Sequence, residues 1–275
     1  MVLVGEHNKP AALGQSRGGG YRGAMQDLLA LAVRLADDAA ALIREVRAAG
    51  FIVSAKSDET PVTVADTRAE ALILAGLRAA APEIPVIAEE EVAAGHHITP
   101  GVRYWLVDPL DGTREFAAGR DEFAVNIALI EHGAPVLGAV ASPALEELHF
   151  GIVGQGAWRR RGGREERIAA RAAPPEGLTV MASRHYADAP ELAALLAQYK
   201  IAALTNIGSA LKFLRLAEGA ADFYPRLGRT MEWDTAAPQA VLEAAGGRVL
   251  TTGGTALRYG KPGWENPDFS AWGLR

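Results

Sequence analysis

An apolar stretch of the chain runs directly into two aspartates: Tyr104-Trp105-Leu106-Val107-Asp108-Pro109-Leu110-Asp111-Gly112-Thr113. The apolar part predicts a buried strand, and α/β proteins place their chemistry at the ends of such strands. Pro109 stiffens the bend after the strand, so that Asp108 and Asp111 can converge together with the carbonyl of Leu110. These oxygens are the ligands that Mg²⁺ prefers. A lone Asp-Gly pair would be an ordinary turn, but the whole segment predicts a metal site.

The end of the same segment offers a place for an anion. Gly112 permits close approach, and Thr113 begins a predicted short helix over residues 113–116. The first turn of a helix has unpaired backbone N–H groups, which suit a phosphate. We therefore expect the metal ligands and a phosphate-binding site to be adjacent.

Three further acidic positions lie near predicted element ends. Glu89 follows the apolar run Val86-Ile87-Ala88, Asp66 falls in the first turn of a helix that begins near Thr63, and Asp234 precedes a helical run. Each has a simpler interpretation alone: a solvated acidic end, a favourable helix-terminal charge or an N-cap. Taken together they favour a cation site, because converging acids repel one another unless cations neutralise them.

Hydrophobic periodicity outside these motifs predicts a mixed α/β chain with helices layered on sheets. Helices are expected from residue 25 to 50, from Thr63, and over 189–198, 209–217 and 234–245. Strands are expected over 86–88, 104–107, 123–130, 135–141, 148–153, 156–160, 178–182, 222–225 and 248–251, with antiparallel hairpins between 123 and 160. We interpret residues 1–24 as a flexible leader, 25–170 as one half with the metal motifs, and 171–275 as a second half that completes the site.

Composition excludes several classes of function. The chain has 275 residues, no cysteine and a formal net charge of −5. Without cysteine there is no disulfide scaffold, thiolate metal centre or Cys nucleophile. The acidic balance argues against binding to nucleic-acid polymers, and no apolar run approaches the ~20 residues of a membrane span. We expect a cytoplasmic protein, a monomer or homodimer, with peripheral association with the inner membrane left open.

The motifs resemble the signatures of the inositol monophosphatase superfamily. The principal matches are Glu89-Glu90, Asp108 to Thr113 and Trp233 to Ala237; further matches are residues 56–58, 61–66, 115–116, 125–130, 183–185, 208–213, 217–219 and 224–226. Within the superfamily, the chain looks most like the bacterial 3′(2′),5′-bisphosphate nucleotidases. The resemblance implies the five-layer α/β/α/β/α sandwich shared with fructose-1,6-bisphosphatase.

The resemblance also implies roles for these residues. Two to three Mg²⁺ ions (Mn²⁺ is a possible substitute) would be held by Glu89, Asp108, the Leu110 carbonyl, Asp111 and Asp234. Asp66, Thr113 and Glu89 would be catalytic, in a single in-line attack by a metal-activated water. The amides of Gly112 and Thr113 would hold the phosphate that is cleaved.

Substrate contacts are implied at Arg184, His185, Gly208, Ser209, Lys212 and Asp234. A second phosphate needs positive groups, and Lys212, Arg184 and His185 are the candidates. Considered alone, Lys212 is equally well a helix lysine that snorkels to water, and Arg184 a surface arginine. His96-His97 and the basic run at 159–161, which Glu165 and Glu166 follow, are expected at the surface, the latter as a solvated hairpin.

One departure from the family pattern is Pro238, where glycine is common. If Asp234 caps its helix, Pro238 lies in the first turn and costs little.

The leading hypothesis is a lithium-sensitive phosphatase that converts adenosine 3′,5′-bisphosphate to AMP and acts on the sulfated analogue in sulfur assimilation. Activity on inositol monophosphate or fructose 1,6-bisphosphate is the alternative within the family. A non-catalytic phosphate-binding regulator is the alternative from another class.

Overall fold

The computed structural model describes residues 16–55, 61–96, 98–184 and 190–274. The helices are α1 (Ser16–Ala49), α2 (Val64–Ala80), α3 (Glu89–Ala93), α4 (Thr113–Ala117), α5 (Pro190–Leu196), α6 (Leu211–Ala217) and α7 (Glu232–Ala244). The first nine strands are β1 (Val53–Ala55), β2 (Pro61–Thr63), β3 (Val86–Ala88), β4 (Arg103–Asp111), β5 (Ala124–Glu131), β6 (Ala134–Ser142), β7 (Glu147–Ile152), β8 (Gly156–Arg161) and β9 (Arg164–Ile168). The others are β10 (Leu178–Ser183), β11 (Ile201–Ile207), β12 (Phe223–Arg226), β13 (Arg248–Thr251) and β14 (Phe269–Trp272).

The strands form two large sheets and one small one. A seven-stranded sheet has the order β3-β4-β5-β6-β7-β8-β9, parallel only between β3 and β4, and a five-stranded sheet has the order β11-β10-β12-β14-β13. The predicted antiparallel hairpins between residues 123 and 160 are therefore confirmed. The basic run at 159–161 pairs with β9 in a hairpin, in which Arg159 lies opposite Glu166.

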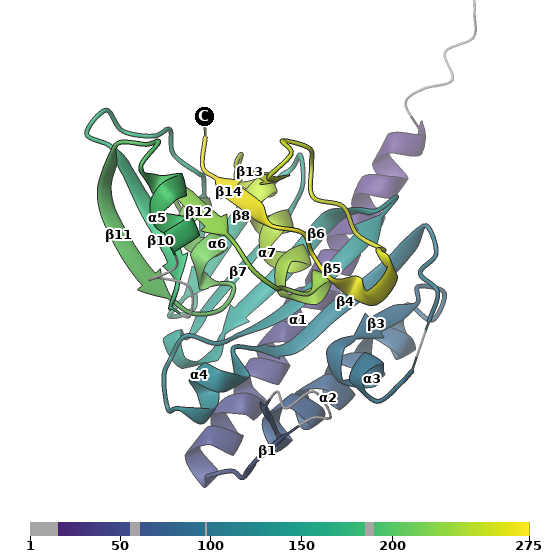
Figure 1. The fold of residues 1–275 in the computed structure, drawn as a ribbon. Coiled ribbons are helices and arrows are strands. Elements are labelled where there is room, and N and C mark those ends of the chain that lie inside the picture. The colour runs from purple at the N-terminus through teal and green to yellow at the C-terminus, as the bar shows by residue number, and fades with distance from the viewer. Residues whose placement is uncertain (1–15, 56–60, 97, 185–189, 275) are drawn as a thin grey trace, which may run out of the picture.

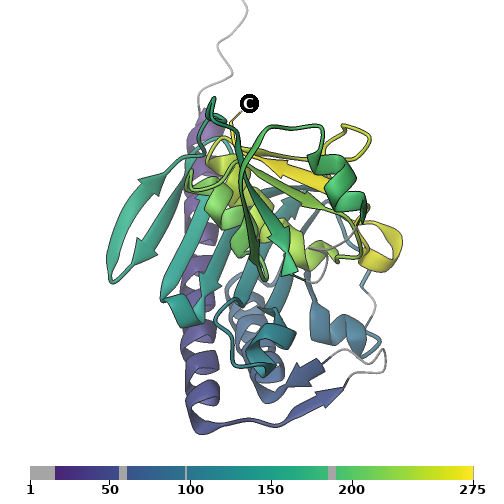
Figure 2. The same cartoon turned by 60° about the vertical axis from the view of Figure 1, so that its left-hand side comes forward.

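Helices cover both sheets, and the predicted layered α/β fold is confirmed. Helices α1 and α2 pack together on one face of the seven-stranded sheet, and α6 and α7 lie between the two sheets (Figures 1 and 2). The outer face of the five-stranded sheet packs against Leu195 and Leu196 of α5. The order of layers is thus α/β/α/β/α. None of the described helices has the length and apolar character needed to cross a membrane.

Helix α7 lies unusually close to the seven-stranded sheet. A side chain at Gly138 of β6 would place its Cβ 2.4 Å from the carbonyl oxygen of Ala237, so only glycine fits there. One apolar cluster contains residues of both sheets and of α6 and α7. The change from one sheet to the other between Ile168 and Leu178 coincides with the predicted boundary near residue 170, but the two halves as separate units remain a prediction.

The structure differs from the sequence-based expectation at several elements. Helix α1 begins at Ser16, inside the stretch that we interpreted as a leader, and the Tyr21 hydroxyl anchors it by donating to Glu131 Oε2 at 2.6 Å. The remaining leader residues, 1–15, lie outside the described residues. Six further elements were not predicted from the sequence: β1, β2, α3, β9, β11 and β14.

Candidate active site

A bulge at the end of β4 brings the two aspartates of the opening segment to one face. Asp108 pairs with Asn126 of β5 and Asp111 pairs with Ala124, so three steps along β4 oppose two steps along β5. Residues three apart in a regular strand point to opposite faces, and the one extra residue corrects this difference. Asp108 Oδ1 accepts the Leu110 N–H at 2.9 Å, which fixes the bend. The predicted convergence of Asp108 and Asp111 on one face is therefore present.

Asp66 connects the start of α2 with the start of α4. Its Oδ2 accepts both the backbone N–H and the hydroxyl of Thr63 at 2.7 Å, while the Thr63 oxygen accepts the Ala65 N–H. Its Oδ1 accepts the Thr113 hydroxyl at 3.0 Å. Asp66 is thus both part of a capping box and a partner of Thr113, so the simple helix-terminal interpretation does not explain its bond to Thr113.

Burial raises the pKa of the Asp66 carboxyl, although the hydrogen bonds from Thr63 and Thr113 act in the opposite direction. A carboxyl with a raised pKa accepts a proton more readily near neutral pH. Thr113 Oγ1 also lies 3.1 Å from the Leu110 carbonyl oxygen, so its single proton has two possible acceptors.

Asp234 reaches the site from the first turn of α7, but it is not the N-cap. The N-cap is Met231, and Asp234 is the third helical residue, where its Oδ2 accepts the Met231 N–H at 2.9 Å. Our inference about Pro238 was therefore wrong. Because the helix begins at Glu232, Pro238 lies in its interior and cannot donate a hydrogen bond to the carbonyl of Asp234, four residues earlier.

Burial and the repulsion of neighbouring carboxylates raise the pKa values of Asp108, Asp111 and Asp234. Asp108 is fully buried, and burial together with the charge of Glu89 raises its pKa well above the usual value. The pKa of Asp234 rises to about 8, because of burial first and the charge of Asp111 second. The pKa of Asp111 rises only to about 6, because burial raises it and the positive charge of Lys212 partly offsets this effect. A cation among these groups would relieve the repulsion.

The donor set suits a hard divalent cation. Glu89, Asp108, Asp111 and Asp234 line one cavity of about 260 Å³, to which Leu110 and Thr113 also contribute. These are oxygen donors of the kind that Mg²⁺ takes. Across the described residues, however, no three His, Cys, Asp or Glu side chains lie close enough together to coordinate one metal ion without moving. The residues fit a metal in type and line one cavity, and binding would have to draw the carboxylates together.

The predicted substrate residues divide into two groups. Gly112, Thr113, Gly208, Ser209 and Lys212 line the cavity. Gly112 has φ of +95° at the start of α4, and a Cβ there would lie 2.9 Å from the Glu122 carbonyl oxygen, so glycine is needed.

Arg184 is not among the residues that line the cavity. Its guanidinium forms an ion pair with Glu122. His185, His97 and residues 56–60 lie outside the described residues.

Lys212 is buried and holds the loop before α6. Its Nζ donates to the carbonyl oxygens of Ser209 at 2.6 Å and Ile207 at 3.3 Å, and it lies 5.2 Å from the centroid of the Tyr224 ring. Snorkelling to water is therefore not its role. Burial lowers the pKa of Lys212 to about 8, with the charge of Asp111 opposing the change.

Three arginines of the cavity, Arg114, Arg226 and Arg229, were not predicted from the sequence as site residues. Arg226, at the end of β12, donates to the Arg229 carbonyl at 2.7 Å, and both side chains line the cavity. Arg226 belongs to a matched segment, which was a signal, whereas Arg229 lies in a loop without any local pattern.

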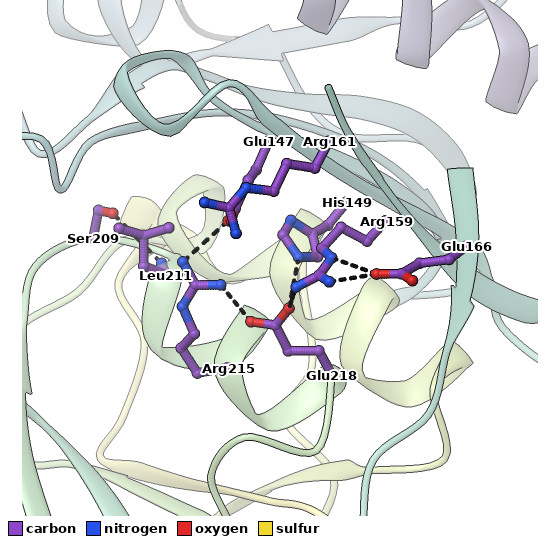
Figure 3. A network of polar contacts seen from close by, with 9 residues as sticks. All are labelled: Glu147, His149, Arg159, Arg161, Glu166, Ser209, Leu211, Arg215 and Glu218. Carbon is purple, nitrogen blue, oxygen red and sulfur yellow. Dashed lines mark hydrogen bonds and ion pairs between the residues drawn. The ribbon is translucent and has the colours of Figure 1, made fainter. Parts of the chain in front are cut away.

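A network of charged side chains fixes α6, the helix that carries Lys212 (Figure 3). Arg215 of α6 donates to Glu147 of β7 at 3.0 Å and to Glu218, and Arg159 of β8 also pairs with Glu218. Burial raises the pKa of Glu218, but His149 and Arg215 outweigh it and lower the pKa to about 2. The network therefore ties the end of α6 to the seven-stranded sheet through ion pairs of Arg215 with Glu147 and of Arg159 with Glu218.

The chain is similar to known proteins along most of its length. Residues 24–271 match the inositol monophosphatase family. The chain is 46% identical over 215 residues to the 3′(2′),5′-bisphosphate nucleotidase CysQ of Salmonella typhimurium, which covers 78% of this chain and 86% of that protein. The corresponding CysQ of Escherichia coli K12 is 44% identical over 218 residues, covering 79% of this chain and 87% of that protein.

Solved structures agree with this similarity. The crystal structure of CysQ from Bacteroides thetaiotaomicron matches with a TM-score of 0.76 and 33% identity, over 91% of this chain and 98% of that one. An inositol monophosphatase from Zymomonas mobilis matches with a TM-score of 0.75 and 28% identity, over 91% and 94% of the two chains.

Proposed function

The chain belongs to the inositol monophosphatase family, and we propose that it is a Mg²⁺-dependent phosphomonoesterase that removes the 3′-phosphate of adenosine 3′,5′-bisphosphate to give AMP. The relatives that are named 3′(2′),5′-bisphosphate nucleotidases support this activity. The sulfated analogue of the same nucleotide would be a second substrate. Cytoplasmic location and a monomeric or homodimeric state belong to the same proposal.

One observation favours a substrate with two phosphates over one with a single phosphate: acidic and basic side chains line the same cavity. Five acidic residues are present, of which four form the proposed cation site, and four basic residues accompany them: Arg114, Lys212, Arg226 and Arg229. A substrate with one phosphate needs only the cation site. A second phosphate needs positive groups of its own, and the arginines supply them.

The metal ligands in this proposal are Glu89, Asp108, the Leu110 carbonyl, Asp111 and Asp234. When bound, Mg²⁺ ions would neutralise the charge of the phosphate and activate water. The protein contributes the fixed oxygens: the bulge of β4 aims Asp108 and Asp111, and the capping box of α7 aims Asp234.

Asp66 and Thr113 would handle the proton of the attacking water. If the Thr113 hydroxyl donates to Asp66, its oxygen is free to accept a hydrogen bond from water. The water would then be held by Thr113, with Asp66 as the final proton acceptor. The amides of Gly112 and Thr113 would hold the phosphate, and Ser209 and Gly208 would face the nucleoside. Arg184 and His185 stay predictions for the second phosphate.

A phosphate-release panel tests the proposal. We expect turnover of adenosine 3′,5′-bisphosphate that requires Mg²⁺, is inhibited by millimolar Li⁺, and exceeds turnover of inositol 1-phosphate and fructose 1,6-bisphosphate. Equal or faster turnover of inositol phosphate would contradict the nucleotidase assignment. A folded protein without turnover of any phosphomonoester would favour the non-catalytic regulator.

A further inference from the structure

Helix α3 carries Glu89 but has little to hold it in place. It is five residues long, its N-cap Ala88 has no side-chain hydrogen bond to offer, and its first turn contains Glu89, Glu90 and Glu91. Helices this short do not persist without outside contacts. Since Glu89 is the first residue of α3, the position of its carboxylate depends on how this helix start is fixed.

Glu70 of α2 supplies the missing cap from a neighbouring helix. Its Oε2 accepts the Glu90 N–H at 2.8 Å, and its Oε1 accepts the Glu91 N–H at 2.9 Å. Glu70 as a residue is only 4% exposed, so water does not compete strongly for these bonds. Both oxygens are engaged with the N–H groups that α3 cannot satisfy itself.

A buried carboxylate at position 70 lowers the stability of the fold, because its ionised form is disfavoured there. Burial raises the pKa of Glu70 to about 7, and the negative charges of Glu90 and Glu91 also oppose its ionised form. The two backbone hydrogen bonds offset only part of this cost. A neutral side chain would be easier to bury, but none of the neutral polar side chains has two acceptor oxygens for two adjacent N–H groups.

A second contact between the same helices provides a comparison. Arg78 of α2 pairs with Glu91 at 2.7 Å, but the arginine side chain is 49% exposed and the pair is on the surface. Exposed pairs of this kind contribute little. Val92 packs α3 against a buried apolar cluster, but the buried Glu70 carboxylate is the contact that binds the backbone N–H groups at the helix start.

We propose that Glu70 is a positioning residue for the metal site: it caps α3 across space and so holds the Glu89 carboxylate toward Asp108. The inference rests on the proposed function, in which Glu89 is a metal ligand. Glu70 itself does not line the cavity, so it acts only through the backbone of α3.

Binding of Mn²⁺ to the whole 275-residue chain, measured by titration calorimetry, tests this role. In Glu70→Gln the side-chain oxygen can still accept from one of the two N–H donors. The amide nitrogen faces the other donor and cannot accept a hydrogen bond from it. We expect roughly tenfold weaker Mn²⁺ binding, as for other residues that orient metal ligands, together with faster amide exchange over residues 89–93. Arg78→Ala is the matched control and should change neither quantity.

Two further variants make the outcomes distinct. Glu70→Asp keeps the charge, but its side chain is too short to reach the N–H groups of Glu90 and Glu91. It should therefore also weaken Mn²⁺ binding. This variant takes the place of Glu70→Gln if the glutamine variant does not fold. Glu89→Gln should weaken binding directly. If Glu89→Gln weakens binding while a folded Glu70 variant binds Mn²⁺ like the wild type, the positioning role is wrong and the proposed function stands. If Glu89→Gln has no effect, the metal assignment and this inference both fail.

Discussion

The substitution Asp66→Asn separates the chemical role of this carboxylate from its structural role. In the wild type, Asp66 Oδ2 accepts hydrogen bonds from the backbone N–H and the hydroxyl of Thr63. The side-chain oxygen of asparagine would retain both bonds. The amide nitrogen would then face the Thr113 hydroxyl, which lies 3.0 Å away in the wild type. Because that nitrogen donates, the Thr113 proton would turn toward the Leu110 carbonyl at 3.1 Å. The threonine oxygen would no longer be free to accept from a water.

The two consequences have different magnitudes. Most of the cap survives in Asp66→Asn, so we expect a loss of about 1 kcal/mol or less in the free energy of unfolding. Loss of the proton acceptor should lower kcat by roughly 10²- to 10⁴-fold. Thr63→Ala is the matched control, because it removes the capping hydroxyl while its backbone N–H still donates to Asp66. It should lower stability by about 1 kcal/mol and leave kcat nearly unchanged.

The assay is phosphate release at saturating Mg²⁺ and substrate, with urea unfolding of the same preparations. Wild-type kcat in Asp66→Asn would refute the role of Asp66 as proton acceptor. Equal loss of kcat in Thr63→Ala and Asp66→Asn would show that the cap of α2, and not the chemistry of Asp66, controls the rate.

Three further substitutions test other parts of the structure. The pKa of Glu218 in the folded protein, about 2, lies below its ordinary value of 4.5, so its stabilising effect is present above pH 4.5 and is lost as the pH falls toward 2. Wild type should exceed Glu218→Gln in unfolding free energy by about 3 kcal/mol at pH 7, with the difference shrinking below pH 4.5; a constant difference would contradict the assignment. Gly138→Ala should push α7 away and cost about 1–3 kcal/mol in urea unfolding, whereas Gly101→Ala, whose nearest contact is 3.9 Å away, should cost little. Lys212→Met should raise KM for adenosine 3′,5′-bisphosphate roughly tenfold, and an unchanged KM would remove Lys212 from substrate binding.

The sequence was sufficient to predict those features of the site whose contacting residues are close together along the chain. The cap at Thr63, the short helix after Gly112 and the convergence of Asp108 with Asp111 all involve neighbours along the chain. The start of α7 was misplaced by two residues, because an aspartate before a helical run fits an N-cap as well as the third position. The interpretation of Pro238 failed for the same reason.

Features that depend on distant contacts were not predictable. The strand β11 has exposed or half-exposed residues throughout and lacks the alternation that marks a half-buried strand. Arg229 reaches the cavity from an irregular loop. Glu70 looks like a solvated helix residue in the sequence, and only the packing of α2 against α3 turns it into a buried cap. Each of these depends on where the chain returns in space.

The dependence of phosphate release on Asp108 and Mg²⁺ is the sharpest test of the proposal that this chain is a metal-dependent phosphatase. The measurement compares wild type and Asp108→Asn with adenosine 3′,5′-bisphosphate, with Mg²⁺ and with a chelator, after circular dichroism has shown that both are folded. We predict turnover only in the wild type with Mg²⁺. Turnover of the wild type in chelator, or wild-type rates in Asp108→Asn, would exclude Asp108 as a ligand of a catalytic metal.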